Sequence, residues 1–210
     1  MHDQSFWQGR WGNQQIGFHE GKPNDLLVAH VERLERQRTK LRILVPLAGK
    51  AVDLSWLAAR GHEVVGVEFV RKAVEEFFAE APSECGVTMV CDDFFRVDPG
   101  TLGKFDVIYD RAALIALDPP TRAPYVERCR ALLKDDGVTF LISITYDQSK
   151  APGPPWSIDQ ETVRQLFAGR SIELLETRSS PPNPRLRQAG IASLDESAYL
   201  IARVGDPPGV

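Results

Sequence analysis

The sequence predicts an α/β protein with a mostly parallel, seven-stranded sheet, helices on both faces and an antiparallel last strand. The first observation is a regular alternation of short β-branched runs with segments of helical periodicity. The second is the length of 210 residues, which suits one domain over 1–210 and would be cramped for two. The third is the composition, 43% hydrophobic and 26% charged, which excludes a globally disordered chain.

The first half of the chain alternates helix and strand. Residues 24–38 are predicted to be a helix, because Asn24 is a favoured N-cap residue and apolar side chains recur at helical spacing. Strand 41–46 is short and apolar, and helix 51–60 follows it as far as a glycine. A β-branched strand at 63–67 comes next. The pattern then repeats as helix 71–80 and as strands at 87–91 and 105–109.

The second half closes the predicted sheet. Helical pieces at 111–117 and 121–133 are broken by a Pro-Pro pair, and a long apolar strand follows at 138–146. A further helix is predicted at 159–168, after a Pro/Gly-rich loop at 150–157. The last two strands, 171–177 and 197–204, are joined by a polar stretch without helical periodicity, so we expect them to pair antiparallel. Residues 205–210 are expected to fray.

Charge and cysteine content exclude several classes of protein. The chain has 25 Lys+Arg and 29 Asp+Glu residues, and this net charge of -4 gives no support to nucleic-acid binding. Cys85, Cys91 and Cys129 form no CxxC pair, which argues against a disulfide framework and a structural zinc site. No apolar run is long enough to span a membrane, and no signal-peptide pattern opens the chain. We therefore expect a cytoplasmic monomer that binds no metal.

Two of the four tryptophans, Trp7 and Trp11, lie near the N-terminus. Chain ends are usually loose and polar, so two large rings there need a specific reason.

The ends of the predicted strands carry the candidate binding residues. In an open α/β sheet, ligands bind beyond the carboxyl ends of the strands. Gly49 follows the first strand, and its turn matches neither GxGxxG nor the Walker pattern, so an ordinary turn is the alternative. Glu68 ends the second strand, 19 positions (68 − 49) after Gly49, where an acid binds ribose hydroxyls. Its alternative role is that of a helix-start acid.

The third and fourth strands extend the same pattern. Asp93 and Phe94 follow the third strand, where an acid and an aromatic ring suit adenine, although a capped turn is the alternative. Asp110 and Arg111 follow the fourth strand. Because these ends share one edge of the sheet, they favour an adenosine-type cofactor. The turns lack triphosphate and pyrophosphate features, so S-adenosyl-L-methionine fits best.

Six segments, in this order, resemble the thiopurine S-methyltransferase family of S-adenosylmethionine-dependent methyltransferases, which have a Rossmann-like sheet. The segments are Trp7-x3-Trp11-x6-Phe18-His19, Pro46-Leu47-Ala48-Gly49-Lys50, Gly61-His62-x-Val64-Val65-Gly66-Val67-Glu68, Phe105-Asp106-x3-Asp110-Arg111-x-Ala113-Leu114, Tyr146-Asp147 and Gly153-Pro154-Pro155. The resemblance covers about residues 6–204. It implies a methyltransferase domain whose N-terminal part, 1–38, forms a helical lid and a first helix.

The resemblance also implies roles for individual residues. Trp11 and Phe18, with Trp7 close by, match the aromatic residues that cover the cofactor. Leu47 matches a cofactor contact beside Gly49, and Glu68 matches the acid that binds ribose. On the far side, Arg111 matches a residue near the sulfonium and the methyl acceptor, and it is the one catalytic candidate. The adenine is expected against Asp93 and Phe94, and the acceptor against Phe18, Arg111, Pro154, Pro155 and Trp156.

Two positions depart from the family pattern. Ala48 replaces the usual cysteine of the Pro-Leu-Cys-Gly-Lys turn, which makes a catalytic thiol there unnecessary. Trp156 follows Gly-Pro-Pro where Phe is more common, and the larger ring would narrow the acceptor pocket. The second departure concerns the identity of the acceptor more than the reaction.

Methyl transfer to sulfur requires little from the protein beyond alignment, a dry pocket and a positive group near the thiolate. Arg111 is the candidate for that positive group, and a structural ion pair with Asp110 or Glu68 is its alternative role. His19 and Asp147 are candidate bases, but neither is assigned. Lys50 is a weak cofactor neighbour.

The acceptor is expected to be a small-molecule thiol or a similar soft nucleophile. A thiopurine-like heteroaromatic thiol, an aliphatic thiol, and selenium, tellurium or halide anions all remain open. The alternatives to this function are a metabolite O- or N-methyltransferase, a non-catalytic nucleotide-binding module, and an NAD-dependent oxidoreductase, which the missing GxGxxG disfavours.

Overall fold

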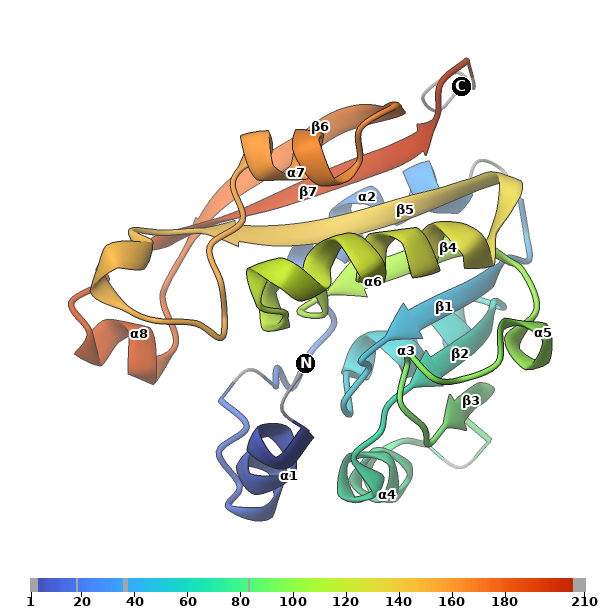
Figure 1. Cartoon of the computed structure of the whole chain (residues 1–210). Helices are drawn as coiled ribbons and strands as arrows, with labels where there is room; N and C mark the ends of the chain where they lie inside the picture. The colour runs from blue at the N-terminus through green and yellow to red at the C-terminus, as the bar shows by residue number, and fades with distance from the viewer. Residues whose placement is uncertain (1–3, 18, 36–37, 83, 206–210) are drawn as a thin grey trace.

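The fold of the protein, taken from a computed structural model, is described for residues 4–17, 19–35, 38–82 and 84–205. Its centre is a seven-stranded sheet in the order β3-β2-β1-β4-β5-β7-β6 (Figure 1). The strands are β1 (Arg42–Pro46), β2 (Glu63–Val67), β3 (Val87–Val90), β4 (Phe105–Arg111), β5 (Leu133–Thr145), β6 (Arg170–Ser180) and β7 (Leu194–Arg203).

The predicted topology is confirmed. Strands β1 to β5 pair in parallel, and β7 lies antiparallel between β5 and β6. The last two strands pair with each other as expected, and only β7 runs against the rest of the sheet. This is the mixed, Rossmann-like sheet that the alternating sequence predicts.

Helices cover both faces of the sheet. The helices α2 (Asp25–Glu35), α3 (Val52–Ala59) and α4 (Arg71–Glu80) place Leu27, Leu54 and Phe77 in one buried cluster. The helices α6 (Pro119–Leu132) and α7 (Gln160–Leu166) place Tyr125 and Val163 in the cluster on the other face. In Figure 1, α6 lies in front of β4 and β5, and α2 lies behind the sheet. No helix of the described chain has the length and apolar character needed to cross a membrane.

The structure differs from the predicted elements in four places. Strand β4 continues to Arg111, so the helix expected at 111–117 is reduced to a short 3-10 turn, Leu114–Ala116. Strand β5 begins at Leu133, earlier than expected. Two short helices, α5 (Pro99–Leu102) and α8 (Pro184–Gln188), were not predicted. Each follows an Asp or Asn cap whose side chain accepts a backbone hydrogen bond, with proline at the helix start, which is a signal that the sequence contains.

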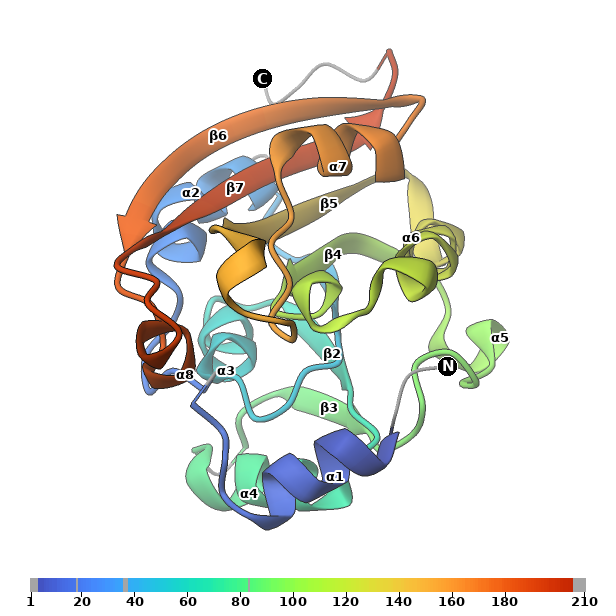
Figure 2. The ribbon, with the colours of Figure 1, turned by 60° about the vertical axis from the view of Figure 1, so that its left-hand side comes forward.

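The N-terminal helix α1 (Gln4–Gly12) lies beside α4, at the end of the sheet where the parallel strands finish (Figure 2). The expected N-terminal helix is present as α1, α2 belongs to the layer behind the sheet, and the lid role expected for 1–38 stays a prediction. Residues 206–210, for which fraying was expected, lie outside the described part of the chain.

Candidate active site

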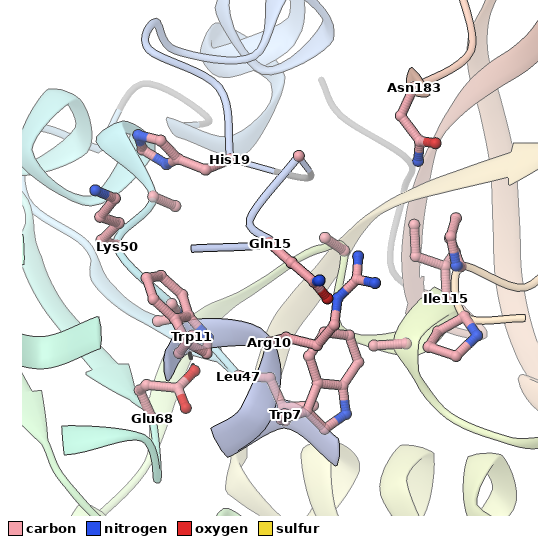
Figure 3. Close-up of a pocket in the computed structure, with 18 of the residues that line it drawn as sticks. Trp7, Arg10, Trp11, Gln15, His19, Leu47, Lys50, Glu68, Ile115 and Asn183 are labelled. Carbon is pink, nitrogen blue, oxygen red and sulfur yellow. Dashed lines mark hydrogen bonds between the residues drawn. The ribbon is translucent and has the colours of Figure 1, made fainter. Parts of the chain in front are cut away.

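A cavity of about 410 Å³ opens at the carboxyl ends of the strands. It lies between α1, the turn after β1, the ends of β2 and β4, and the loop that contains Pro154 and Pro155. Figure 3 shows Trp11, Leu47 and Glu68 on one side, Ile115 and Asn183 on the other, and the Arg10 side chain pointing between them. A volume of this size suits a small-molecule site.

The turn after β1 forms one wall of the cavity. Leu47 and Gly49 both have positive φ angles, 50° and 55°, so the backbone turns sharply just after the strand. Gly49 also lets Trp11 approach closely, since a Cβ atom there would lie 3.3 Å from the Trp11 ring. A side chain at Gly49 would therefore meet both backbone strain and the lid.

Glu68 holds this turn in place. Its carboxylate accepts the backbone N–H of Gly49 at 2.9 Å and that of Val70 at 2.8 Å. The side chain is 6% exposed, and burial raises its pKa although these hydrogen bonds favour the charged form.

The same carboxylate fits a ribose. Backbone N–H groups of Gly49, Val70 and Phe69 act on this carboxylate, which has about four lone-pair sites, so one is left that a ribose hydroxyl can use. The residues on this side therefore suit S-adenosylmethionine: Glu68 for the ribose, the Leu47–Gly49 turn for close backbone approach, and Trp11 as a cover.

The two tryptophans lie on the lid side of the cavity. Trp11 is 2% exposed and packs against Val70 and Ala73 in a small cluster separate from the two main ones. Trp7 lies against the same cluster, and both rings line the cavity. Phe18, the third predicted cover residue, lies outside the described residues.

Arg111 lines the cavity at the end of β4 and forms an ion pair with Glu20. The alternative partners considered from the sequence, Asp110 and Glu68, are engaged elsewhere. Burial opposes the charge of Arg111, but the negative charges of Glu20 and Asp53 favour it, and the pKa of Arg111 is raised. Arg111 is therefore a permanent cation in a site that is largely shielded from water.

Asp110 supports the turn that follows Arg111. Its buried carboxylate accepts the Tyr125 hydroxyl at 2.8 Å and the backbone N–H of Leu114 at 3.1 Å. Burial raises the pKa of Asp110 from 3.8 to about 6. The turn includes Ala112, which lines the cavity with a φ angle of 67°.

The acceptor loop is only partly in the cavity wall. Pro154 and Pro155 line the cavity, and the Arg185 guanidinium donates to the carbonyl oxygens of Pro152 and Pro154. Trp156 is not among the lining residues. Its backbone N–H donates to the carbonyl oxygen of Ile115 at 2.7 Å, and its ring faces the Arg122 guanidinium.

Asp93 and Phe94 are not brought to the cavity wall. Asp93 accepts a hydrogen bond from Gln4 of α1 at 2.9 Å, so it contacts the lid helix. Phe94 is 3% exposed and packs in the core, with its ring centre 5.5 Å from that of Tyr125. The predicted adenine contacts of these two residues stay a prediction.

The three weaker candidates, His19, Lys50 and Asp147, differ in their position and in their partners. His19 lines the cavity, and burial, followed by the charge of Lys50, lowers its pKa. Lys50 also lines it, but its ammonium is held by Glu76 and Glu80 of α4. The Asp147 carboxylate accepts the backbone N–H of Ser149 as the cap of a short turn, which is the alternative considered for it.

Four charged or polar residues of the cavity were missed by the sequence reasoning: Arg10, Gln15, Asn183 and Arg185. The Nε atom of Arg10 is buried without a hydrogen-bond partner among the described residues. Burial, followed by the charge of Arg185, lowers the pKa of Arg10. No local pattern marks these residues, because the N-terminal segment and α8 line the same cavity only in the folded protein. Within the described ranges, no group of three His, Cys, Asp or Glu side chains is placed to hold a metal ion.

Comparisons with known proteins agree with this geometry. The family profile "Thiopurine S-methyltransferase (TPMT)" matches residues 2–204. A thiopurine S-methyltransferase of Pseudomonas aeruginosa is 39% identical over 214 residues, which cover 94% of this chain and 98% of the relative. One from Pseudomonas putida is also 39% identical, covering 95% of this chain and 99% of the relative.

Solved structures show the same fold at low sequence identity. The 1,6-didemethyltoxoflavin-N1-methyltransferase of Burkholderia thailandensis, solved with bound S-adenosylhomocysteine, has a TM-score of 0.62 and 18% identity. The similarity covers 93% of this chain and 85% of that structure. Together with the match along almost the entire sequence, these findings show that the chain belongs to the thiopurine S-methyltransferase family and is an S-adenosylmethionine-dependent methyltransferase.

Proposed function

We propose that the enzyme transfers the methyl group to the sulfur, or a similarly soft anionic atom, of a small molecule, as in a thiopurine S-methyltransferase. The observation that carries this proposal is the position of Arg111. Its guanidinium is a shielded cation in the same cavity as Glu68 and the Leu47–Gly49 turn. An anionic acceptor beside Arg111 would face the cofactor side of the cavity.

S-Adenosylmethionine, when bound, supplies a methyl group on a positively charged sulfur, which is already activated for displacement. The chain then has to bind and orient it. Glu68 would accept from the ribose, and the sharp turn at Gly49 would admit the cofactor close to the backbone. Trp7 and Trp11 would exclude water, and a ring face near a sulfonium adds cation–π attraction of about 0.5–2 kcal/mol.

On the acceptor side, the residues suit a nucleophile that reaches the cavity already deprotonated. The thiolate is the reactive form of a thiol, and an aromatic thiol ionises readily near neutral pH. Arg111 would hold this anion, while the apolar side chains of Ile115, Pro154 and Pro155 limit the access of water. Alignment of the two reactants would then supply most of the catalysis.

A second candidate is methyl transfer to oxygen or nitrogen, which requires a base. His19 favours it, since it lines the cavity and its lowered pKa keeps the imidazole neutral and able to accept a proton at pH 7.

A matched series of thiophenol, phenol and aniline separates the two candidates. With wild-type enzyme and S-adenosylmethionine, we expect methylation of thiophenol at the highest rate, and a His19→Asn variant that keeps most of this rate. Preferred methylation of phenol or aniline, lost in His19→Asn, would contradict transfer to sulfur. Products are quantified by mass spectrometry.

We also propose that the enzyme works as a cytoplasmic monomer of one domain on small molecules rather than nucleic acids. The cavity volume of about 410 Å³ and the net charge of -4 support a small acceptor. Three free cysteines support a reducing compartment. Light scattering after size-exclusion chromatography tests the monomer, and a dimeric mass would contradict it.

A further inference from the structure

Two arginines of the cavity, Arg111 and Arg10, differ in whether a carboxylate of the protein pairs with them. Arg111, whose side chain is 13% exposed, pairs with Glu20, which is 39% exposed. Glu20 lies in the segment 13–24 between α1 and α2, on the lid side of the molecule. For Arg10, by contrast, the described residues provide no carboxylate within ion-pair distance. The cation best placed for the acceptor therefore already carries a counter-ion from the protein.

Two further acids lie near Arg111, from α3 and β7. Burial raises the pKa values of Asp53 and Glu196, and the charge of the Arg111 guanidinium opposes this rise in both acids. Asp53 is held in place because it accepts the backbone N–H of Asn24 at 2.7 Å. Arg111 would thus remain compensated if Glu20 moved away, and the separation of this pair would not leave an isolated buried charge.

Glu20 is also the acid of this group that can move. Its carboxylate is the most exposed, and it is carried by a connecting segment rather than by a helix or strand. Asp53 belongs to α3 and Glu196 to β7, which are packed elements. The Glu20 side chain is already partly solvated, and its charge is hydrated further when it leaves Arg111 for water, so separation of the pair costs little on the Glu20 side.

We propose that Glu20 is a displaceable counter-ion, which occupies the position on Arg111 that an anionic acceptor takes and thereby sets the charge specificity of the acceptor site. This inference rests on the proposed function, because it assumes that the acceptor binds at Arg111. A thiolate must compete with Glu20, whereas a neutral acceptor leaves the ion pair intact.

The charge change of the reaction makes this arrangement useful. A bond forms between the thiolate sulfur and the methyl carbon, while the bond from that carbon to the sulfonium breaks and its electron pair stays on the cofactor's sulfur. The acceptor sulfur is then a neutral thioether, which no longer attracts Arg111. Glu20 can return to the guanidinium, so the same carboxylate that weakens acceptor binding favours product release.

The test compares Glu20→Gln with Glu75→Gln. The first variant keeps the size of the side chain and removes its charge, and the second makes the same change on an exposed residue of α4. We measure the affinities of benzenesulfinate, an aromatic anion, and benzyl alcohol, a neutral molecule, for enzyme loaded with S-adenosylhomocysteine. In Glu20→Gln we expect benzenesulfinate to bind about tenfold more tightly, a difference of about 1.4 kcal/mol, with benzyl alcohol unchanged.

Kinetics give a second readout. For thiophenol, Glu20→Gln is expected to lower KM by a similar factor and to lower kcat if product release limits turnover. Equal benzenesulfinate affinities for the Glu20 and Glu75 variants, equal shifts for both ligands, or no binding of the anion to either would overturn the inference. Failure of the proposed function looks different: wild-type enzyme would methylate no thiol, while the binding comparison would still decide the role of Glu20.

Discussion

The two halves of the cavity are built in different ways. The cofactor half consists of strand ends and backbone, with Glu68 hydrogen-bonded to the turn at Gly49. The proposed acceptor half combines Arg111, from the end of β4, with side chains from loops and short helices, and Arg111 is paired with Glu20 from the segment between α1 and α2. From this difference we expect a fixed half that binds one cofactor and, if Glu20 is displaceable as proposed, a second half in which charge can be exchanged.

The largest effect is expected where one element serves both halves. Deletion of residues 1–20 removes α1 and its two tryptophans, together with Glu20, and we expect the affinity for S-adenosylmethionine to fall about a hundredfold or more, consistent with the loss of one buried and one partly buried large ring. The domain should stay folded, because Trp11 belongs to a small cluster outside the main core. Calorimetry measures the first result and circular dichroism the second. Loss of the fold would mean that these rings are core residues.

The cofactor half alone is tested by Glu68→Ala. We expect weaker cofactor binding by about 1.5–3 kcal/mol, because a charged hydrogen-bond partner of the ribose and of the Gly49 turn is lost. Glu75→Ala, on the exposed side of α4, is the control. Titration calorimetry with S-adenosylhomocysteine measures the effect. Unchanged affinity would reduce Glu68 to a helix-start acid.

The acceptor half is tested by Arg111→Ala. Turnover of anionic thiols is expected to fall about tenfold or more, while cofactor affinity changes much less, because the role proposed for this cation is to hold the acceptor. Arg130→Ala, which removes an exposed arginine of α6, is the control. The two quantities come from steady-state rates and calorimetry. The reverse pattern would place Arg111 on the cofactor side.

The Asp110 carboxyl group, next to Arg111 in the chain, is expected to make the stability of the fold depend on pH. The pKa of Asp110 rises from 3.8 to about 6 in the folded protein, so the folded state binds this proton more tightly. The resulting stabilisation is present below about pH 4 and is lost as pH rises through about 6, and it amounts to roughly 3 kcal/mol.

The Asp110→Asn variant has no carboxyl group at this position, so it should lack this pH-dependent part of the unfolding free energy. Urea unfolding of wild type and variant at several pH values between 4 and 7 measures the difference in their unfolding free energies, which should change across that range. Parallel pH dependences for the two proteins would show that the Asp110 carboxyl titrates normally.

The difference between the two halves also explains which parts of the site can be predicted from the sequence. The sheet, Gly49 and Glu68 follow from local patterns, because a strand, its turn and the acid of the next strand lie close together in the chain. The pairing of Arg111 with Glu20 joins distant segments, so no local pattern reveals it. Arg185 was missed for a related reason: the short helix α8 comes to the cavity only through the path of the chain between β6 and β7.

Phe94 shows a second limit. An aromatic residue just after a strand has the same sequence pattern whether it faces adenine or the core, and here it packs against Tyr125. The direction of its side chain depends on the tertiary packing of α6, which local sequence does not encode.

The most direct test of transfer to sulfur uses an acceptor that offers several atoms at once. A mercaptopurine carries one sulfur and several ring nitrogens, and S-adenosylmethionine with an isotope-labelled methyl group lets NMR locate the methyl in the product. The account predicts the methyl group on sulfur. A product methylated on a ring nitrogen would contradict it.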